Sequence, residues 1–100
     1  MATIAQVKIS LDPPITSTTF DEYFTSLLEA AALDLGIAGV NLPATLDAIC
    51  DRAEITYCAY HWEMDHGSTD RAEKLKVSYD EQKAQLSMAT GYTDWSMIND

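Results

Sequence analysis

The stretch that decides the fold is residues 44–66, ATLDAICDRAEITYCAYHWEMDH. It predicts one long helix, because no glycine or proline interrupts it and the preceding Pro43 is tolerated in the first turn of a helix. The apolar residues recur at helical spacing and form one stripe: Leu46, Ile49, Cys50, Ala53, Tyr57, Tyr60 and Met64. Gly67 follows and is expected to end the helix.

This apolar stripe is wider than one neighbouring helix can cover. Ile55, Ala59 and Trp62, with Cys58 beside them, extend it to a second flank. A stripe of this width is typical of a central helix. We therefore expect the other helices of the chain to cover one flank, and a neighbouring subunit to contact Ile55, Ala59 and Trp62 on the other.

Another helix is predicted upstream, over residues 20–35. Its apolar residues fall on one face: Phe20, Tyr23, Phe24, Leu27, Leu28, Ala31 and Leu35. Thr19 and Glu22 have the spacing of a capping box, in which each side chain accepts from a backbone N–H that the helix leaves free. Gly36 is expected to terminate this helix.

A third main helix is predicted downstream, from about residue 70 to residue 89. Asp70 and Glu73 resemble a weaker capping box. The apolar face is narrow and consists of Ala72, Leu75, Tyr79, Leu86 and Ala89, with Gln82 at the same spacing. Charged residues between these positions favour a helix with most of its surface in solvent.

The charge of the chain is strongly negative and unevenly distributed. Sixteen acidic and six basic residues give a net charge of −10, which disfavours direct binding of nucleic acid. Residues 1–70 have a net charge of −9, whereas residues 71–83 have +1. We expect an identical copy or an acidic partner to dock on this less negative segment through Arg71, Lys74 and Lys76.

The two ends of the chain give less regular patterns. Val7, Ile9 and Leu11 alternate with polar residues as in a short strand, but Ile4, Val7 and Leu11 also fit one side of a short helix, so both alternatives stay open. The last segment, residues 91–100, follows the final helix and contains four large apolar side chains: Tyr92, Trp95, Met97 and Ile98. We expect these four to bind a partner, because large aromatic residues outside a helix are typical interface anchors.

Length and composition complete the prediction of the fold class. With 100 residues, of which 47% are hydrophobic, the chain has enough apolar material for one core and is too short for two domains. We predict an all-α protein, a small bundle of three main helices with a short N-terminal helix or strand. Residues 1–90 would form the domain and residues 91–100 an extended C-terminal tail that binds the partner.

The spacing of the cysteines and histidines shows whether the chain could form a metal site. Cys58 and His61 are one helical turn apart, but Cys50 and His66 lie too far along the same helix to join them. A disulfide between Cys50 and Cys58 is also excluded within one helix, because their Cα atoms would be about 12 Å apart. We expect two buried, reduced thiols, and neither a metal nor another cofactor.

No pattern in the chain predicts an enzyme or a membrane protein. The cysteines and histidines lack the glycine-rich turn that a nucleophile needs, and Gly36 and Gly39 lack the rest of a nucleotide-binding motif. The chain has no long apolar run of transmembrane length and no signal-peptide pattern at its start. We therefore expect a non-catalytic protein that does not enter a membrane.

The order of these segments resembles a known protein family. A helix containing Leu27-Leu28-Glu29-Ala30-Ala31, followed by a longer helix ending in Tyr57-Cys58-Ala59-Tyr60-His61-Trp62-Glu63, is similar to head-tail connector proteins of tailed bacteriophages, also called adaptor or head-completion proteins. Val7-Lys8 and Leu11-Asp12 are similar to the opening segment of that family. Pro13-Pro14, the alternation near the N-terminus and the well-formed third helix depart from its pattern.

The resemblance implies a structural protein of the virion at the head-tail interface, made in the bacterial cytoplasm. It implies a dodecameric ring beneath the portal protein, with a tail-side connector protein on its other face and double-stranded DNA passing through without specific binding. The alternative is a small acidic binding module, such as an antitoxin or inhibitor, that covers a basic protein. A zinc-binding domain is a third hypothesis, which metal analysis of the purified protein would test.

Overall fold

The computed structural model describes residues 2–11, 13–37 and 44–90, with side chains as far as Ser87. These residues form four helices and contain no strand: α1 Ile4–Ser10, α2 Asp21–Asp34, α3 Ala44–His66 and α4 Thr69–Thr90. The prediction of an all-α bundle with three main helices is therefore confirmed for the described part of the chain. The predicted C-terminal tail, residues 91–100, lies outside it.

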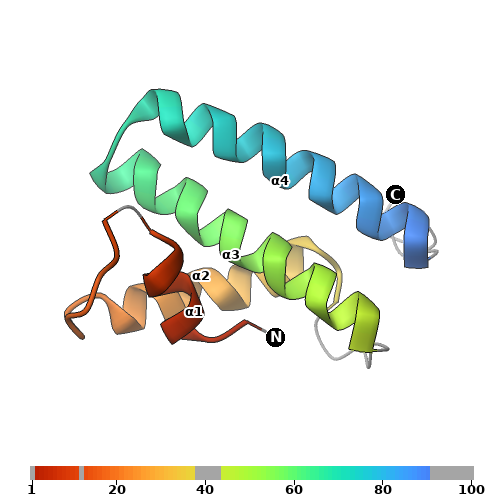
Figure 1. Cartoon of the computed structure of the whole chain (residues 1–100), viewed down its shortest axis with the longest axis horizontal. Helices are drawn as coiled ribbons and strands as arrows, with labels where there is room; N and C mark the ends of the chain where they lie inside the picture. Colours follow the sequence, from red (N-terminus) through yellow and green to blue (C-terminus); the bar gives the residue numbers. More distant parts are fainter. Residues whose placement is uncertain (1, 12, 38–43, 91–100) are drawn as a thin grey trace.

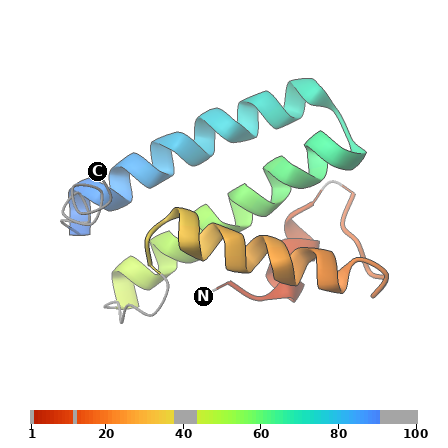
Figure 2. The same cartoon turned by 180° about the vertical axis from the view of Figure 1, so that it is seen from behind.

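The arrangement has α3 at its centre. This helix contacts each of the other three, with α4 antiparallel along one side and with α1 and α2 on the opposite side (Figures 1 and 2). Within the described residues, the backbone of α4 approaches that of α3 alone. One long surface of α4 is therefore open to solvent.

Two groups of buried side chains lie one after the other along α3. The first joins α1 and α2 to the C-terminal half of α3 and consists of Ala2, Val7, Leu11, Phe24, Leu28, Cys58 and Ala59. The second joins the end of α2 to the N-terminal half of α3 and to α4, and consists of Ala32, Leu35, Ile37, Cys50, Ala53, Tyr79 and Leu86. The buried residues of α3 thus face both sides of the helix, as the wide stripe predicts.

The N-terminal segment is a helix, which decides between the two alternatives left by its sequence. Val7 and Leu11 are buried four residues apart, whereas Ile9 is 73% exposed, so the apolar residues follow the helical and not the strand period. Thr3 and Gln6 form a capping box: the Thr3 hydroxyl accepts from the Gln6 N–H, and the Gln6 side chain accepts from the Thr3 N–H.

The capping box predicted at Thr19 and Glu22 is wrong. The residue before α2 is Phe20, which makes no side-chain capping bond, and the Thr19 hydroxyl accepts from Ser17 at 2.9 Å. The Ser17 hydroxyl therefore competes with the backbone N–H groups of the helix for the Thr19 hydroxyl. Gly36 does end this helix region, with φ of 71°, a left-handed conformation that glycine adopts without strain.

The start of α4 also differs in detail from its prediction. The Arg71 N–H donates to the Ser68 hydroxyl at 3.4 Å, so Ser68 takes the capping position and Asp70 lies within the first turn. The predicted apolar face is confirmed at Ala72, Tyr79 and Leu86, which are buried. This face packs against α3 and leaves the charged residues of α4 on the outside.

Candidate functional site

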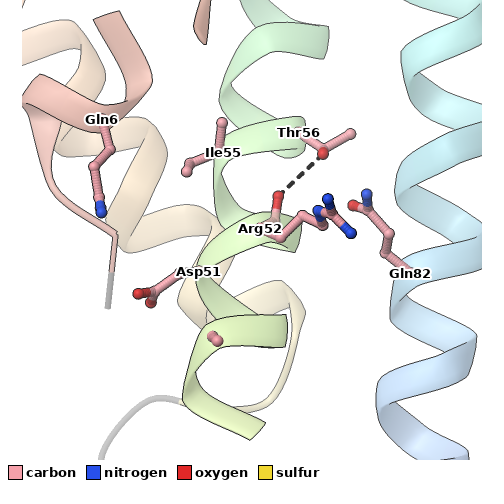
Figure 3. A pocket seen from close by; sticks show the side chains of 7 residues that line it. Gln6, Asp51, Arg52, Ile55, Thr56 and Gln82 are labelled. Atoms are coloured by element: carbon pink, nitrogen blue, oxygen red, sulfur yellow. Dashed lines mark hydrogen bonds between the residues drawn. The ribbon is translucent and has the colours of Figure 1, made fainter. Parts of the chain in front are cut away.

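A groove runs over α3 where neither α1 nor α4 covers it (Figure 3). Its main hollow has a volume of about 510 Å³ and is lined by Gln6, Ala48, Asp51, Arg52, Ile55, Thr56 and Gln82. A second hollow of about 260 Å³ shares Ala48, Arg52 and Gln82 with it and adds Ile49 and Gln85. Because they share three residues, the two hollows are adjacent, and we refer to them together as the groove, with α3 as its floor.

The lengths of the helices explain why this groove exists. α1 has 7 residues and α3 has 23, so α1 is about 10 Å long and α3 about 34 Å, and α1 can cover only part of α3. α4 lies on α3 from another side and does not contact α1 through its backbone. A strip of α3 around Arg52 is therefore left between them.

Arg52 supplies the positive charge of the groove. Its side chain is exposed, and the ion pairs among the described residues involve Lys8, Arg71 and Lys83 but not Arg52. Lys8, the other basic residue before Arg71, contacts the Asp21 carboxylate at 3.0 Å. Arg52 is therefore the cation that this face offers to a ligand, and a guanidinium binds a carboxylate through two parallel hydrogen bonds.

The opposite wall of the groove presents side-chain amides. Figure 3 shows Arg52 and Gln82 pointing toward one another, from α3 and α4. The Gln82 side-chain oxygen is buried and has no hydrogen-bond partner among the described residues. The Thr56 hydroxyl, in contrast, donates to the Arg52 carbonyl oxygen at 3.0 Å, which satisfies it within α3. The groove thus combines an exposed guanidinium, the Asp51 carboxylate and an unsatisfied amide oxygen, so its lining is polar and carries charges of both signs.

Next to the groove, Glu54 is fully buried between α3 and the N-terminal segment. Its Oε1 accepts from the Ala2 N–H at 3.1 Å, and its Oε2 has no hydrogen-bond partner among the described residues. Burial raises the pKa of this carboxyl, although the hydrogen bond from Ala2 acts in the opposite direction. Glu54 therefore connects the N-terminal segment to α3. Its carboxylate is poorly solvated in this position.

The cysteines and histidines do not come together as a metal site. No group of three potential ligand side chains occurs in the described ranges 2–11, 13–37 and 44–90. Burial, followed by the nearby charge of Glu54, raises the pKa of Cys50 to about 11 and that of Cys58 to about 12. Both are free, buried thiols, and the raised pKa makes each a poor nucleophile and ligand at neutral pH.

The two histidines take part in aromatic packing. The His66 ring stacks on Trp62, with 4.2 Å between centroids, and the His61 ring lies 4.5 Å from Tyr57 and 4.8 Å from Tyr60. The Tyr23 hydroxyl donates to Asp65 at 2.8 Å, and burial together with this bond raises the pKa of Tyr23. The bond from Tyr23 holds the start of α2 against the end of α3, whereas these ring contacts of the two histidines lie within α3.

The predicted subunit interface divides into two groups in the structure. Ala59 is buried in the first core group, and Ile55 and Trp62 pack against that group. The physical reason is that α1 and α2 already cover the flank of α3 that the sequence pattern assigns to a neighbouring subunit. These three residues therefore contribute to packing inside the chain, and their contact with a neighbouring subunit stays a prediction.

The basic part of the predicted interface is accessible. Arg71, Lys74 and Lys76 are exposed on α4, and the Arg71 guanidinium is 3.8 Å from the Glu63 carboxylate. Lys74 lines a shallow hollow on the outer surface of α4 together with Asp70, Glu73 and Val77. The predicted partner-binding residues Tyr92, Trp95, Met97 and Ile98 lie outside the described residues.

The pattern of residues in the sequence does not predict the groove at Gln6, Arg52 and Gln82. Each of these residues has the polar character of a solvated helix face, and the helices that carry Gln6 and Gln82 are remote in the chain. Arg52 gives a partial signal, because it is one of only two basic residues among the first 70. Which face of α3 stays uncovered depends on helix packing and not on local spacing.

No family model, curated protein or solved structure matches this chain. Within its described residues, no helix has the length and apolar character needed to cross a membrane.

Proposed function

We propose that this protein is a ring-forming structural adaptor of a tailed bacteriophage, which joins the capsid portal to the tail and lines the DNA channel. The observation that supports this proposal best is the open surface of α4. Within the described residues the backbone of this helix approaches that of α3 alone, and the helix carries most of the basic residues of an acidic chain. Such a surface fits contact with an acidic surface of an identical neighbour.

The charges and apolar residues of α4 are suited to that contact. Lys74 and Lys76 are exposed, and Val77 is 59% exposed beside them. An apolar residue next to cations gives a neighbouring subunit both buried area and charge complementarity. Acidic surface is abundant on the rest of the chain, so each copy could supply both halves of a head-to-tail contact that closes into a ring.

The net charge of −10 fits a channel for DNA. A ring of such chains repels the phosphates of the duplex, so DNA moves through it without adhering. The virion location and the portal and tail-side partners follow from the resemblance to connector proteins and are part of the same proposal. The segment with Tyr92, Trp95, Met97 and Ile98 would contact the portal protein.

The ring is tested by the mass of the full chain in solution and by electron microscopy of the assembled particles. We expect closed rings for the natural chain and loss of rings for Lys74→Glu/Lys76→Glu, because the substitutions place carboxylates against an acidic neighbour. The matched control is Lys74→Arg/Lys76→Arg, which keeps the charges and the rings. A chain that stays monomeric at every concentration contradicts the proposal.

The portal contact is tested separately by copurification. A chain without residues 91–100 is expected to lose the portal protein, and the full chain to retain it. Equal recovery of portal protein by both chains overturns the role assigned to the tail.

The acidic binding module is the second proposal, and the same net charge supports it. It predicts a monomer or dimer that captures a cationic protein at low salt and releases it at high salt. Portal, capsid and tail genes beside the gene for this chain would favour the adaptor over the module.

A further inference from the structure

A buried carboxylate lies directly against the first described residue of the chain. We propose that Glu54 is the binding site for a positively charged α-amino group on Ala2, which is created when the peptide bond between residues 1 and 2 is hydrolysed. The resulting ion pair fastens the N-terminal segment to α3. This inference concerns the folded chain itself and does not depend on the ring or on the portal protein.

The Ala2 nitrogen is already in contact with this carboxylate. It donates its N–H to Glu54 Oε1 at 3.1 Å, and both residues are buried, with Ala2 5% exposed and Glu54 0%. Ala2 also belongs to the first core group, together with Val7 and Cys58. An ammonium group at this nitrogen therefore needs no movement of the backbone to reach Glu54.

The carboxylate lacks the donors that an ammonium group supplies. The backbone N–H of Ala2 gives one hydrogen bond and leaves Glu54 Oε2 buried, with no hydrogen-bond partner among the described residues. An ammonium group has three N–H donors and can therefore donate to both oxygens of one carboxylate. Because a buried carboxylate without a charged partner is costly, a cation at Ala2 is expected to stabilise the fold.

The charges around Glu54 also favour a cation at this place. Burial raises the pKa of Glu54 most, and the negative charges of Asp51 and Asp47 raise it further. The hydrogen bond from Ala2 lowers this pKa, and so does a positive charge at the start of the chain. A cation at the Ala2 nitrogen is therefore attracted by three carboxylates, of which Glu54 is in direct contact.

The basic side chains of α1 and of the middle of α3 are directed elsewhere. Lys8 contacts the Asp21 carboxylate at 3.0 Å, and Arg52 points toward Gln82 (Figure 3). Neither of these cations therefore takes the place beside Glu54 that an α-ammonium group at Ala2 would occupy.

The backbone after Ala2 holds its nitrogen in position. The Thr3 N–H donates to the Gln6 side chain at 2.9 Å, and the Gln6 N–H donates to the Thr3 hydroxyl at 3.2 Å. This capping box fixes the start of α1 directly after Ala2. A group that is already ordered loses little conformational freedom when it forms an ion pair.

The hydrolysis consumes one molecule of water. The bond between the carbonyl carbon of residue 1 and the Ala2 nitrogen breaks, the carbon receives the hydroxyl, and the nitrogen receives the hydrogen. The new carboxylic acid then gives its proton to the nitrogen, which becomes the ammonium group. A methionine-specific aminopeptidase could supply this step, because such enzymes require a small residue after the methionine, and residue 2 is alanine. The enzyme has to act before folding, because Ala2 is buried in the folded chain.

The test compares two chains released from the same cleavable fusion, one of residues 1–100 and one of residues 2–100. At about pH 7 the chain that begins at Ala2 is expected to unfold at a temperature several degrees higher. Its α1 amides should also exchange more slowly with solvent in NMR. Glu54→Gln should lower the unfolding temperature of the chain that begins at Ala2 and raise that of residues 1–100.

Two controls separate the ion pair from other effects. Acetylation of the Ala2 nitrogen in the shorter chain keeps one N–H and removes the charge, so it should abolish the gain. This control also keeps the test valid if Glu54→Gln fails to fold. Glu29→Gln in the shorter chain removes an exposed carboxylate from α2 and should leave the gain unchanged.

Three outcomes overturn the proposal. An equal or lower unfolding temperature for the chain that begins at Ala2 shows that the new charge has no favourable partner. A gain that survives both acetylation and Glu54→Gln shows that the ion pair is not its cause. Protein isolated from the organism that makes it, with an intact mass that still includes residue 1, shows that the bond is not hydrolysed.

Discussion

Glu63 connects the end of α3 to the start of α4 through its carboxylate. The residue is 5% exposed, its Oε2 accepts from the Ser68 N–H at 2.9 Å, and its Oε1 faces the Arg71 guanidinium. Gly67 lies in the turn between them, where a Cβ atom would overlap Oε2 and come within 2.8 Å of the carboxyl carbon. The turn thus depends on a carboxylate and on the absence of a side chain beside it.

Gly67→Ala is expected to lower the free energy of unfolding by about 1 to 2 kcal/mol, because the new methyl group displaces the carboxylate from the Ser68 N–H. In a Glu63→Ala background the same substitution should be neutral or stabilising, because Gly67 has no positive φ and alanine restricts the unfolded chain. Denaturant unfolding of the four chains measures both effects. An equal loss in both backgrounds would show that the carboxylate is not the cause.

The buried carboxyl group of Glu54 makes the stability of the fold depend on pH. Since its pKa is raised in the folded chain, its contribution to stability is full below the pKa of the unfolded state and is lost as the pH rises through the folded-state value. Glu54→Gln keeps an acceptor for the Ala2 N–H without the buried charge. It should therefore be more stable than the natural chain at about pH 8, with the difference shrinking toward about pH 4.

Thermal unfolding across this pH range measures the difference. Glu29→Gln, which removes the same charge from an exposed position on α2, is the matched control and should show a smaller change with pH. A difference between Glu54→Gln and the natural chain that is the same at both ends of the range contradicts the assignment.

At the scale of helices, the polar contacts between α4 and α2 meet at the Asp34 carboxylate. The Tyr79 hydroxyl donates to the Asp34 carboxylate at 2.5 Å, and Lys83 contacts the same oxygen at 3.4 Å. Burial, followed by the bond to Asp34, raises the pKa of Tyr79, so its hydroxyl stays a donor over the working pH range. The C-terminal half of α4 is held by this contact and by α3.

Tyr79→Phe is expected to cost about 1 to 2 kcal/mol of stability, because it removes a hydrogen bond to a charged acceptor but keeps the buried ring. The amides of α4 beyond Tyr79 should exchange faster with solvent, while those at the start of α4 change less. Hydrogen exchange measured by NMR checks this pattern. Tyr60→Phe, on a tyrosine whose ring contacts His61, is the control and should leave exchange in α4 unchanged.

The positions of the helices are the feature of this structure that the sequence predicts best. The bounds of α3, Ala44–His66, follow from the apolar spacing and from Gly67, because the burial pattern of one helix is a local property. The caps at Thr19 and Asp70 fail because Ser17 and Ser68 supply competing hydroxyl groups a few residues away. Spacing alone cannot decide between such neighbours.

Tertiary packing explains the features that the sequence could not predict. Ala59 has the spacing of an interface residue, but α1 and α2 cover it, and only their positions in space show this. The groove at Arg52 is the converse case, because a polar strip of α3 stays open between helices from both ends of the chain. In both cases the side chain has the predicted character, and its neighbours are decided by how the helices cross.

For the whole molecule, the dominant property is the repulsion among its carboxylates. The described part of the chain measures 38 × 26 × 22 Å, so its acidic residues lie within a few screening lengths of one another, each about 10 Å at 0.1 M salt. This repulsion destabilises the compact state and opposes the approach of a second copy. Salt should relieve both effects.

Raising sodium chloride from about 0.02 M to about 0.2 M is therefore expected to increase the unfolding temperature of the isolated chain by a few degrees. Differential scanning calorimetry measures this shift, and an equal osmolality of sucrose controls for solvent effects that do not involve charge. An unfolding temperature that falls with salt would indicate that attractive ion pairs, such as Lys8 with Asp21, outweigh the repulsion.

The two buried thiols lie in different core groups, Cys58 in the first and Cys50 in the second. A thiol-specific reagent added to the unmodified protein can reach each sulfur only when the surrounding helices separate. The two labelling rates, assigned by mass spectrometry of the digested product, therefore report separately how often each half of the molecule opens. Equal rates would mean that the chain opens as one cooperative unit. Unequal rates would identify the half of the molecule that opens more often.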